Sequence, residues 1–126
     1  MKKLFALGNR KRKNSNAIGV QAEQKARHYL EKQGLHFVAQ NFRCKVGEID
    51  LIMRAGEVWV FVEVKFRQTN QYGAAAEYFT RGKAAKVKRA IAQYFLTSGL
   101  NSEHTAHRID LIAMDGDQIQ WLQAVD

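Results

Sequence analysis

The spacing of apolar residues predicts two helices in this chain. Near the start, apolar side chains recur every three or four positions, as on one face of an α-helix, and they are Ile18, Ala22, Ala26, Tyr29 and Leu30. We expect a first helix over residues 17–33, ended by Gly34, because glycine readily adopts the left-handed conformation that follows a helix. A similar stripe predicts a second helix over residues 80–98, capped by Thr80 and ended by Gly99.

Five runs rich in Val, Ile and Phe predict strands before and after the second helix. Their ranges are 35–41, 48–54, 57–66, 108–114 and 118–122. Short turns make the first three strands an antiparallel meander, whereas the helix between the third and fourth strands makes those two parallel, with a right-handed crossover. We therefore predict an α/β fold with a mixed sheet flanked by helices. Residues 16–126 would form this single domain, after a basic, flexible tail of residues 1–15.

Three charged residues interrupt the predicted strands. Asp50, Glu63 and Lys65 stand inside otherwise apolar runs, where a plain core strand has neutral side chains. A two-residue turn at 55–56 would place Asp50 directly opposite Phe61. Residues that pair directly share a face of the sheet, and so do residues two apart on one strand. This register predicts that the three charges lie on one face, with the two carboxylates as diagonal neighbours.

Two neighbouring carboxylates indicate a cation between them, because like charges otherwise repel each other. Oxygen ligands are typical of Mg²⁺ or Mn²⁺, so we predict that Asp50, Glu63 and the backbone carbonyl of Val64 hold one of these ions. Such an ion activates water and neutralises charge on phosphate oxygens. Lys65 can orient or deprotonate that water, or stabilise developing negative charge. The alternative is an exposed salt bridge of Glu63 with Lys65 or Arg67.

The charge balance favours a nucleic-acid partner. The formal net charge is +8, but residues 1–13 hold six of the twenty Lys and Arg residues and no acidic ones, which leaves 14 basic against 12 acidic residues elsewhere. On the second helix, Lys83, Lys86 and Arg89 recur every three residues and are predicted to contact phosphates, as is Arg67 after the third strand. The alternatives are a solvated helix face and an ordinary arginine at a strand end.

Three stretches of the chain resemble a known family. They are GEIDLI, FVEVKFR and RIDLIAM, and they look like the YraN family of small bacterial proteins, over nearly the whole chain from Gly19 onward. The aspartate of the first stretch and the Glu-x-Lys of the second also resemble the PD-(D/E)XK pattern of the restriction-endonuclease and Holliday-junction-resolvase superfamily. Ile49 stands where the proline of that pattern would be. The resemblance implies a restriction-endonuclease-like α-β-β-β-α-β core.

The same resemblance implies roles for four residues. Asp50 and Glu63 would be metal ligands, and Lys65 would be the catalytic base or charge stabiliser. Glu23 would be an auxiliary acidic group from the first helix, where it stands at the edge of the apolar stripe; a salt bridge with Arg27 is the alternative. Related resolvases often act as dimers because two strands are cut, so the resemblance also makes a homodimer an expectation.

One further aspartate repeats the context of Asp50. Asp110 stands in RIDLI, as Asp50 stands in EIDLI, but no Glu-x-Lys follows it. We therefore expect Asp110 to form a local pair with Arg108 rather than a second metal site.

The combined pattern predicts a Mg²⁺- or Mn²⁺-dependent endonuclease-like protein, with DNA preferred to RNA as the expected substrate and branched or damaged DNA among the candidates. The alternative is a nucleic-acid-binding module of the same fold with little or no turnover. No apolar run reaches the about 18 residues needed to span a bilayer, so no membrane partner is expected. The single cysteine, Cys44, excludes an internal disulfide and fits a reducing cytoplasm.

Overall fold

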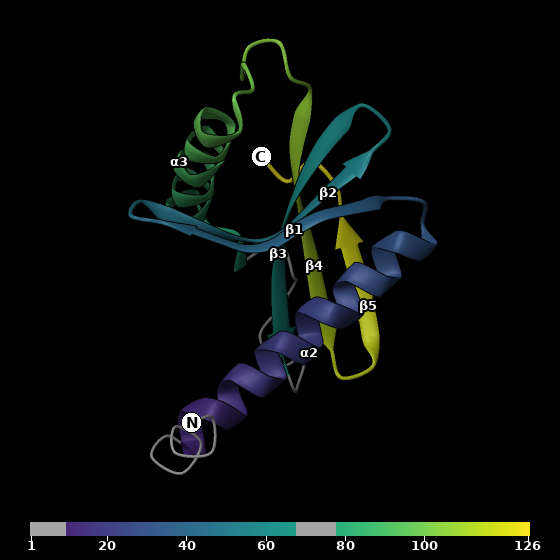
Figure 1. Ribbon diagram of the computed structural model, residues 1–126. Helices are drawn as coiled ribbons and strands as arrows, with labels where there is room; N and C mark the ends of the chain where they lie inside the picture. Colours follow the sequence, from purple (N-terminus) through teal and green to yellow (C-terminus); the bar gives the residue numbers. More distant parts are fainter. Residues whose placement is uncertain (1–9, 68–77) are drawn as a thin grey trace.

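Two helices and five strands follow one another in the order α2, β1, β2, β3, α3, β4, β5 (Figure 1). The computed structural model describes residues 10–67 and 78–126, without the side chains of residues 10–17 and 67. The helices are α2 (Arg10–Lys32) and α3 (Arg81–Ser98), and the strands are β1 (His36–Cys44), β2 (Gly47–Ala55), β3 (Val58–Arg67), β4 (His107–Asp115) and β5 (Gln118–Leu122). The predicted α-β-β-β-α-β core with one last strand is confirmed.

The strands form one mixed sheet in the order β1-β2-β3-β4-β5. β1, β2 and β3 are antiparallel neighbours, β3 and β4 are parallel, and β5 returns antiparallel to β4. One core cluster packs beneath α2 and includes Leu30, Leu51 and Val62. A second packs beneath α3 and includes Phe61 and Phe95. Because Phe61 and Val62 are consecutive on β3, these two clusters lie on opposite faces, and each helix covers one face.

The helix ends follow the predicted signals at α3 but not at the start of α2. The Thr80 hydroxyl accepts a hydrogen bond from the Lys83 N–H at 3.3 Å, and Gly99 ends α3 with φ +73. α2 begins at Arg10 rather than near residue 17, in keeping with the favourable helix propensity of Arg and Lys. Residues 1–9 of the predicted tail lie outside the described part. Within that part, neither helix combines the length and apolar character needed to cross a membrane.

The turn between β2 and β3 lies one residue later than predicted. It consists of Gly56, with φ +62, and the residue after it; glycine adopts this left-handed conformation without strain. The strand pairs therefore shift by two, so that Ile52 pairs with Phe61, and the prediction that Asp50 lies opposite Phe61 is wrong. A shift of two preserves the face of each strand residue, because side chains alternate with a period of two. The pairs end at Leu51 and Val62, and Asp50 and Glu63 are the next residues on the two strands.

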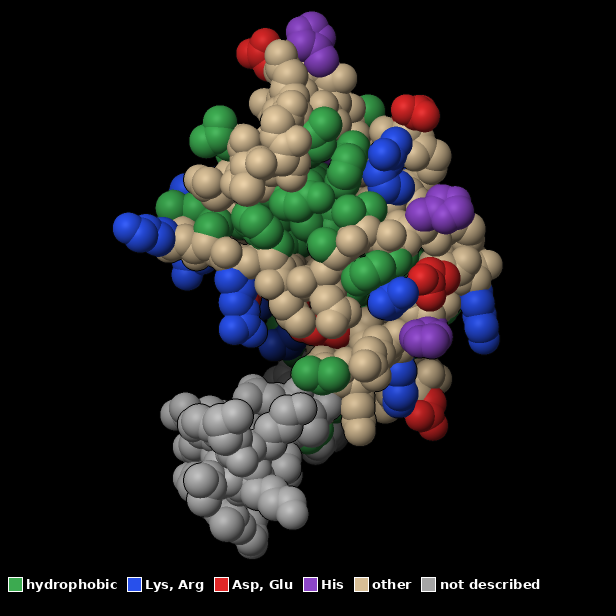
Figure 2. Space-filling model, viewed as in Figure 1, with side chains coloured by type: hydrophobic (Ala, Val, Ile, Leu, Met, Phe, Trp, Pro, Cys, Tyr) green, Lys and Arg blue, Asp and Glu red, His purple; other side chains and the backbone are tan. Residues whose placement is uncertain are grey.

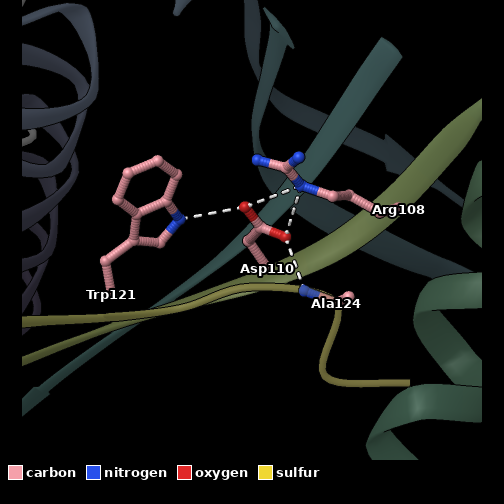
Figure 3. Close-up of polar contacts among 4 residues, drawn as sticks. All are labelled: Arg108, Asp110, Trp121 and Ala124. Atoms are coloured by element: carbon pink, nitrogen blue, oxygen red, sulfur yellow. Dashed lines mark hydrogen bonds and ion pairs between the residues drawn. The ribbon is translucent and has the colours of Figure 1, made fainter. Parts of the chain in front are cut away.

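A buried carboxylate fixes the end of the chain to the sheet (Figure 3). Asp110 on β4 is fully buried, and Arg108 Nε donates to its two oxygens at 3.0 and 3.2 Å, which confirms the predicted pair. The indole Nε1 of Trp121 and the backbone N–H of Ala124 each donate to it at 2.9 Å. These bonds satisfy the carboxylate completely, so Asp110 serves the fold and not a metal site.

We expect Asp110→Asn to lower the free energy of unfolding by about 3 kcal/mol, because it leaves the partly buried Arg108 without its counter-charge. Urea denaturation measures the change. Asp117→Asn, in the exposed turn before β5, is the matched control and should leave the stability within about 0.5 kcal/mol of the parent. Equal stabilities of the two variants would contradict the structural role of Asp110.

Candidate metal and nucleic-acid site

Asp50 lies at a break in the regular alternation of β2. Ile49 packs with Ile52 in the core beneath α3, whereas Leu51 packs beneath α2, so the alternation of faces slips by one residue at this point. The backbone pairing between β2 and β3 also ends at Leu51. Beyond it, Oδ2 of Asp50 accepts a hydrogen bond from the backbone N–H of Val64 at 2.8 Å. The carboxylate thus fills the place where β2 and β3 would otherwise bond to each other.

The carboxyl groups of Asp50 and Glu63 meet in this gap, and each acts on the pKa of the other. Burial is the main cause that raises the pKa of each group, and for Glu63 the negative charge of Asp50 adds to it. The pKa of Glu63 rises to about 8, while the N–H of Val64 partly offsets the effect of burial on Asp50. At neutral pH the pair therefore shares a proton, in the position where a bound cation would supply positive charge.

The donor atoms at this gap fit a hard divalent cation. The N–H and C=O of a strand residue point to the same edge of the strand, so the carbonyl of Val64 faces the same gap as its N–H, which Asp50 accepts. Among the described residues, no three His, Cys, Asp or Glu side chains gather into a ligand cluster. Two carboxylates and a carbonyl suit Mg²⁺ or Mn²⁺, since Mg²⁺ keeps several of its water ligands and needs few protein groups.

Glu23 approaches this pair from α2. Its pKa is raised by burial and then by the charge of Asp50, and the side chain of Asn41 partly offsets this rise. Asn41 has φ +54, a left-handed conformation that asparagine tolerates better than most residues. Asn41 was not among the site residues predicted from the sequence, although a polar residue at the end of the predicted first strand was a usable signal. Arg27 pairs with Glu31 at 3.2 Å, so the alternative partner proposed for Glu23 is engaged elsewhere.

The two lysines near the pair differ in position. The Nζ of Lys65 lies 5.3 Å from the centroid of the Tyr78 ring, and among the described residues no ion pair joins Lys65 to Glu63. Lys83 on α3 is the positive charge that lowers the pKa of both Asp50 and Glu63. The sequence predicted Lys83 only as a phosphate contact, whereas the structure also places its positive charge near both carboxylates.

A pocket of about 610 Å³ opens beside Glu63, between the β1–β2 turn and the start of α3. Its lining includes four basic side chains, Arg43, Lys45, Lys83 and Lys86. Figure 2 shows Lys and Arg side chains gathered beside the β1–β2 turn, which projects toward α3 in Figure 1. Acidic and basic side chains thus line the same cavity.

The predicted phosphate contacts divide into three groups. Lys83 and Lys86 line the pocket, whereas Arg89 is exposed on α3 and is not part of the lining. The side chain of Arg67 lies outside the described residues. Arg43 and Lys45 were not among the residues predicted from the sequence, although two basic residues at alternate positions beside a tight turn were a signal for a basic hairpin tip.

Close backbone contact fixes the β1–β2 turn against α3. A side chain on Gly47 would place its Cβ 2.7 Å from the carbonyl oxygen of Lys86. We expect Gly47→Ala to lower the free energy of unfolding by about 1–3 kcal/mol, because α3 must move away from the turn. Chemical denaturation measures this. Gly19→Ala, where no atom lies within 4 Å of the new Cβ, should be neutral or stabilising, and a Gly47 variant as stable as that control would contradict the expected clash.

The α-β-β-β-α-β core, with an acidic pair where its second and third strands part, defines a protein of the restriction-endonuclease-like class. The chain belongs to the UPF0102 family: residues 22–114 match the model of "Uncharacterised protein family UPF0102", which confirms the resemblance to the YraN family. A UPF0102 protein of Shewanella loihica is 50% identical over 104 residues, which cover 82% of this chain and 89% of that protein. One from Colwellia psychrerythraea is 42% identical over 117 residues, covering 90% and 91%. The matched range includes both carboxylates and both lysines.

Proposed function

We propose that this protein is a divalent-metal-dependent endonuclease that hydrolyses phosphodiester bonds in DNA, in the reducing cytoplasm that suits its free Cys44. The observation that carries the proposal is the pair of partly buried carboxyl groups, Asp50 and Glu63, of which Glu63 lines a pocket with four basic side chains. Burial of two acids side by side opposes folding at neutral pH, so the pair is better explained by ion binding than by stability.

The residues of the pair and its surroundings would divide the work. Asp50, Glu63 and the carbonyl of Val64 would hold Mg²⁺ or Mn²⁺, which when bound lowers the pKa of water and neutralises phosphate charge. Glu23, beside Asn41, would add a carboxylate that orients water near the scissile phosphate. Lys83 would balance the negative charge of the pair and bind phosphate, while Lys65 would serve as base or charge stabiliser.

A cleavage screen tests the proposed activity. Labelled DNA in branched, nicked, duplex and single-stranded forms, with one RNA of matched sequence, is incubated with Mg²⁺, Mn²⁺ or EDTA. Cleavage of DNA that needs the divalent ion and is absent with Glu63→Ala supports the proposal. Binding without cleavage of any substrate would instead support the second candidate, a nucleic-acid-binding module with little or no turnover, which the basic pocket also favours.

The two lysines provide a further test within the same assay. Lys65→Ala should remove cleavage and leave DNA binding intact, whereas Lys83→Ala should weaken both, because Lys83 also lines the pocket. Identical losses in the two variants would contradict this division.

A homodimer would provide two sites for cutting two strands. Sedimentation of the full chain with and without branched DNA tests that arrangement.

A further inference from the structure

We infer that the pocket beside Glu63 binds one single strand of DNA between two basic walls. One wall is the end of the β1–β2 hairpin, with Arg43 and Lys45, and the other is the first turns of α3, with Lys83 and Lys86. This inference rests on the proposed function, because it names the form of the substrate at the same site. It adds two residues, Arg43 and Lys45, that were not among the phosphate contacts predicted from the sequence.

The basic walls have charges available for phosphate. Arg43 contacts Glu48 at 3.4 Å, but the two side chains are 75% and 59% exposed, and an exposed pair of this kind contributes only about 0–1 kcal/mol. Arg43 can therefore exchange Glu48 for a phosphate at little cost. Lys86 is exposed, and Lys83 faces the carboxylates. The two positive charges on each wall can therefore contact successive phosphates of one strand.

The spacing between the walls is fixed in advance. The backbone of Gly47 lies against the carbonyl of Lys86 and the methyl group of Ala90, as the 2.7 and 3.6 Å distances from a built Cβ show. The thiol of Cys44 donates to the carbonyl of Gly47 at 3.3 Å and holds the turn closed. A pre-formed groove binds a flexible strand without paying again for its own ordering.

The size and lining of the pocket favour one strand over a duplex. A volume of about 610 Å³ falls among pockets that enclose drug-sized ligands, roughly 300–1,000 Å³, and so admits one or two nucleotides. Cys44, Val46 and Val87 supply apolar lining for sugar and base, and Val46 is 44% exposed at the turn. A strand that enters between the walls brings its backbone to Glu63, whereas the volume of the pocket leaves no room between the walls for a paired second strand.

Fluorescence anisotropy of a labelled ten-nucleotide single strand tests the inference in EDTA, where no metal-dependent cleavage occurs. Arg43→Ala/Lys45→Ala should weaken binding by about tenfold and reduce the slope of log K against log salt by about 1.4, the loss of two single-strand phosphate contacts. Lys83→Ala/Lys86→Ala should do the same from the other wall. Lys25→Ala/Lys32→Ala, which removes two exposed charges from α2, is the matched control and should change affinity less than twofold.

Three outcomes would overturn the inference. These are an equal loss in the α2 control, a wall variant that binds the single strand as well as the parent, and a ten-base-pair duplex that binds more tightly and loses as much affinity in the wall variants. Thermal melts establish that every variant is folded. Because binding is measured without metal, absence of cleavage would refute the proposed hydrolysis and leave strand binding standing, and loss of strand binding would leave metal-dependent cleavage open to its own test.

Discussion

Asp50→Asn is expected to lower divalent-ion-dependent cleavage of DNA by about 1,000-fold or more, and to remove Mn²⁺ binding. The substitution keeps an oxygen that can accept from the N–H of Val64, which the native carboxylate accepts at 2.8 Å, so the gap between β2 and β3 stays formed. It removes the negative charge that attracts the ion. A bound ion contributes several kcal/mol to stabilising the transition state, and about 4 kcal/mol corresponds to a thousandfold change in rate.

Single-turnover cleavage and isothermal titration with Mn²⁺ measure the two effects of Asp50→Asn separately. Glu103→Gln, an acid-to-amide change in an exposed loop, is the matched control and should retain both properties. If Asp50→Asn bound Mn²⁺ as tightly as the parent protein, Asp50 would not be a ligand. If it also cleaved DNA at the parental rate, the proposed site would be refuted.

The second large effect concerns stability against pH. Burial raises the pKa of Glu63 to about 8 in the folded protein, whereas in the unfolded chain it returns to about 4.5. Between these values the folded state binds the proton that the unfolded state has released, so the free energy of unfolding falls as pH rises. In EDTA we expect a loss of about 4 kcal/mol between pH 4.5 and pH 8, with little further loss from this group above that range.

Urea denaturation across that pH range, compared with Glu63→Gln, isolates this contribution. The amide does not titrate, so the variant should lack the decline and should be more stable than the parent at pH 8. Mn²⁺ should oppose the decline in the parent protein, because an ion that binds only the folded state stabilises it, and it competes with the proton most successfully at high pH. Parallel curves for parent and variant would show that Glu63 has an ordinary pKa.

The core and the order of elements were readable from the chain because they depend on local patterns. The stripe with Ala26 and Leu30 repeats every three or four residues, and hairpin turns and a helical crossover dictate which neighbours are antiparallel or parallel. Thr80 and Gly99 marked the ends of α3, since capping is a contact between residues a few positions apart. The pairing of Asp110 with Arg108, two residues away, was accessible for the same reason.

The local pattern also predicted that Asp50 and Glu63 lie in the same region of the sheet, but it did not predict their actual arrangement. The predicted register was two residues off, and it kept the correct face because strand side chains repeat every second residue. The slip of alternation at Asp50, and its bond to the N–H of Val64, depend on where β2 and β3 stop pairing. That point is set by packing between elements, which no short window of sequence contains.

Hydrophobic spacing, turn residues and charge type in the chain were thus enough to specify an α/β core and a pair of acids on neighbouring strands. The meeting of Arg43 and Lys45 with α3, the contact of Glu23 with Asn41, and the different surroundings of Lys65 and Lys83 became visible in three dimensions. Each joins segments far apart in the chain, and their distances depend on how both helices pack against a twisted sheet. Periodicity reports the face that a residue occupies, whereas packing sets which distant side chains share a cavity.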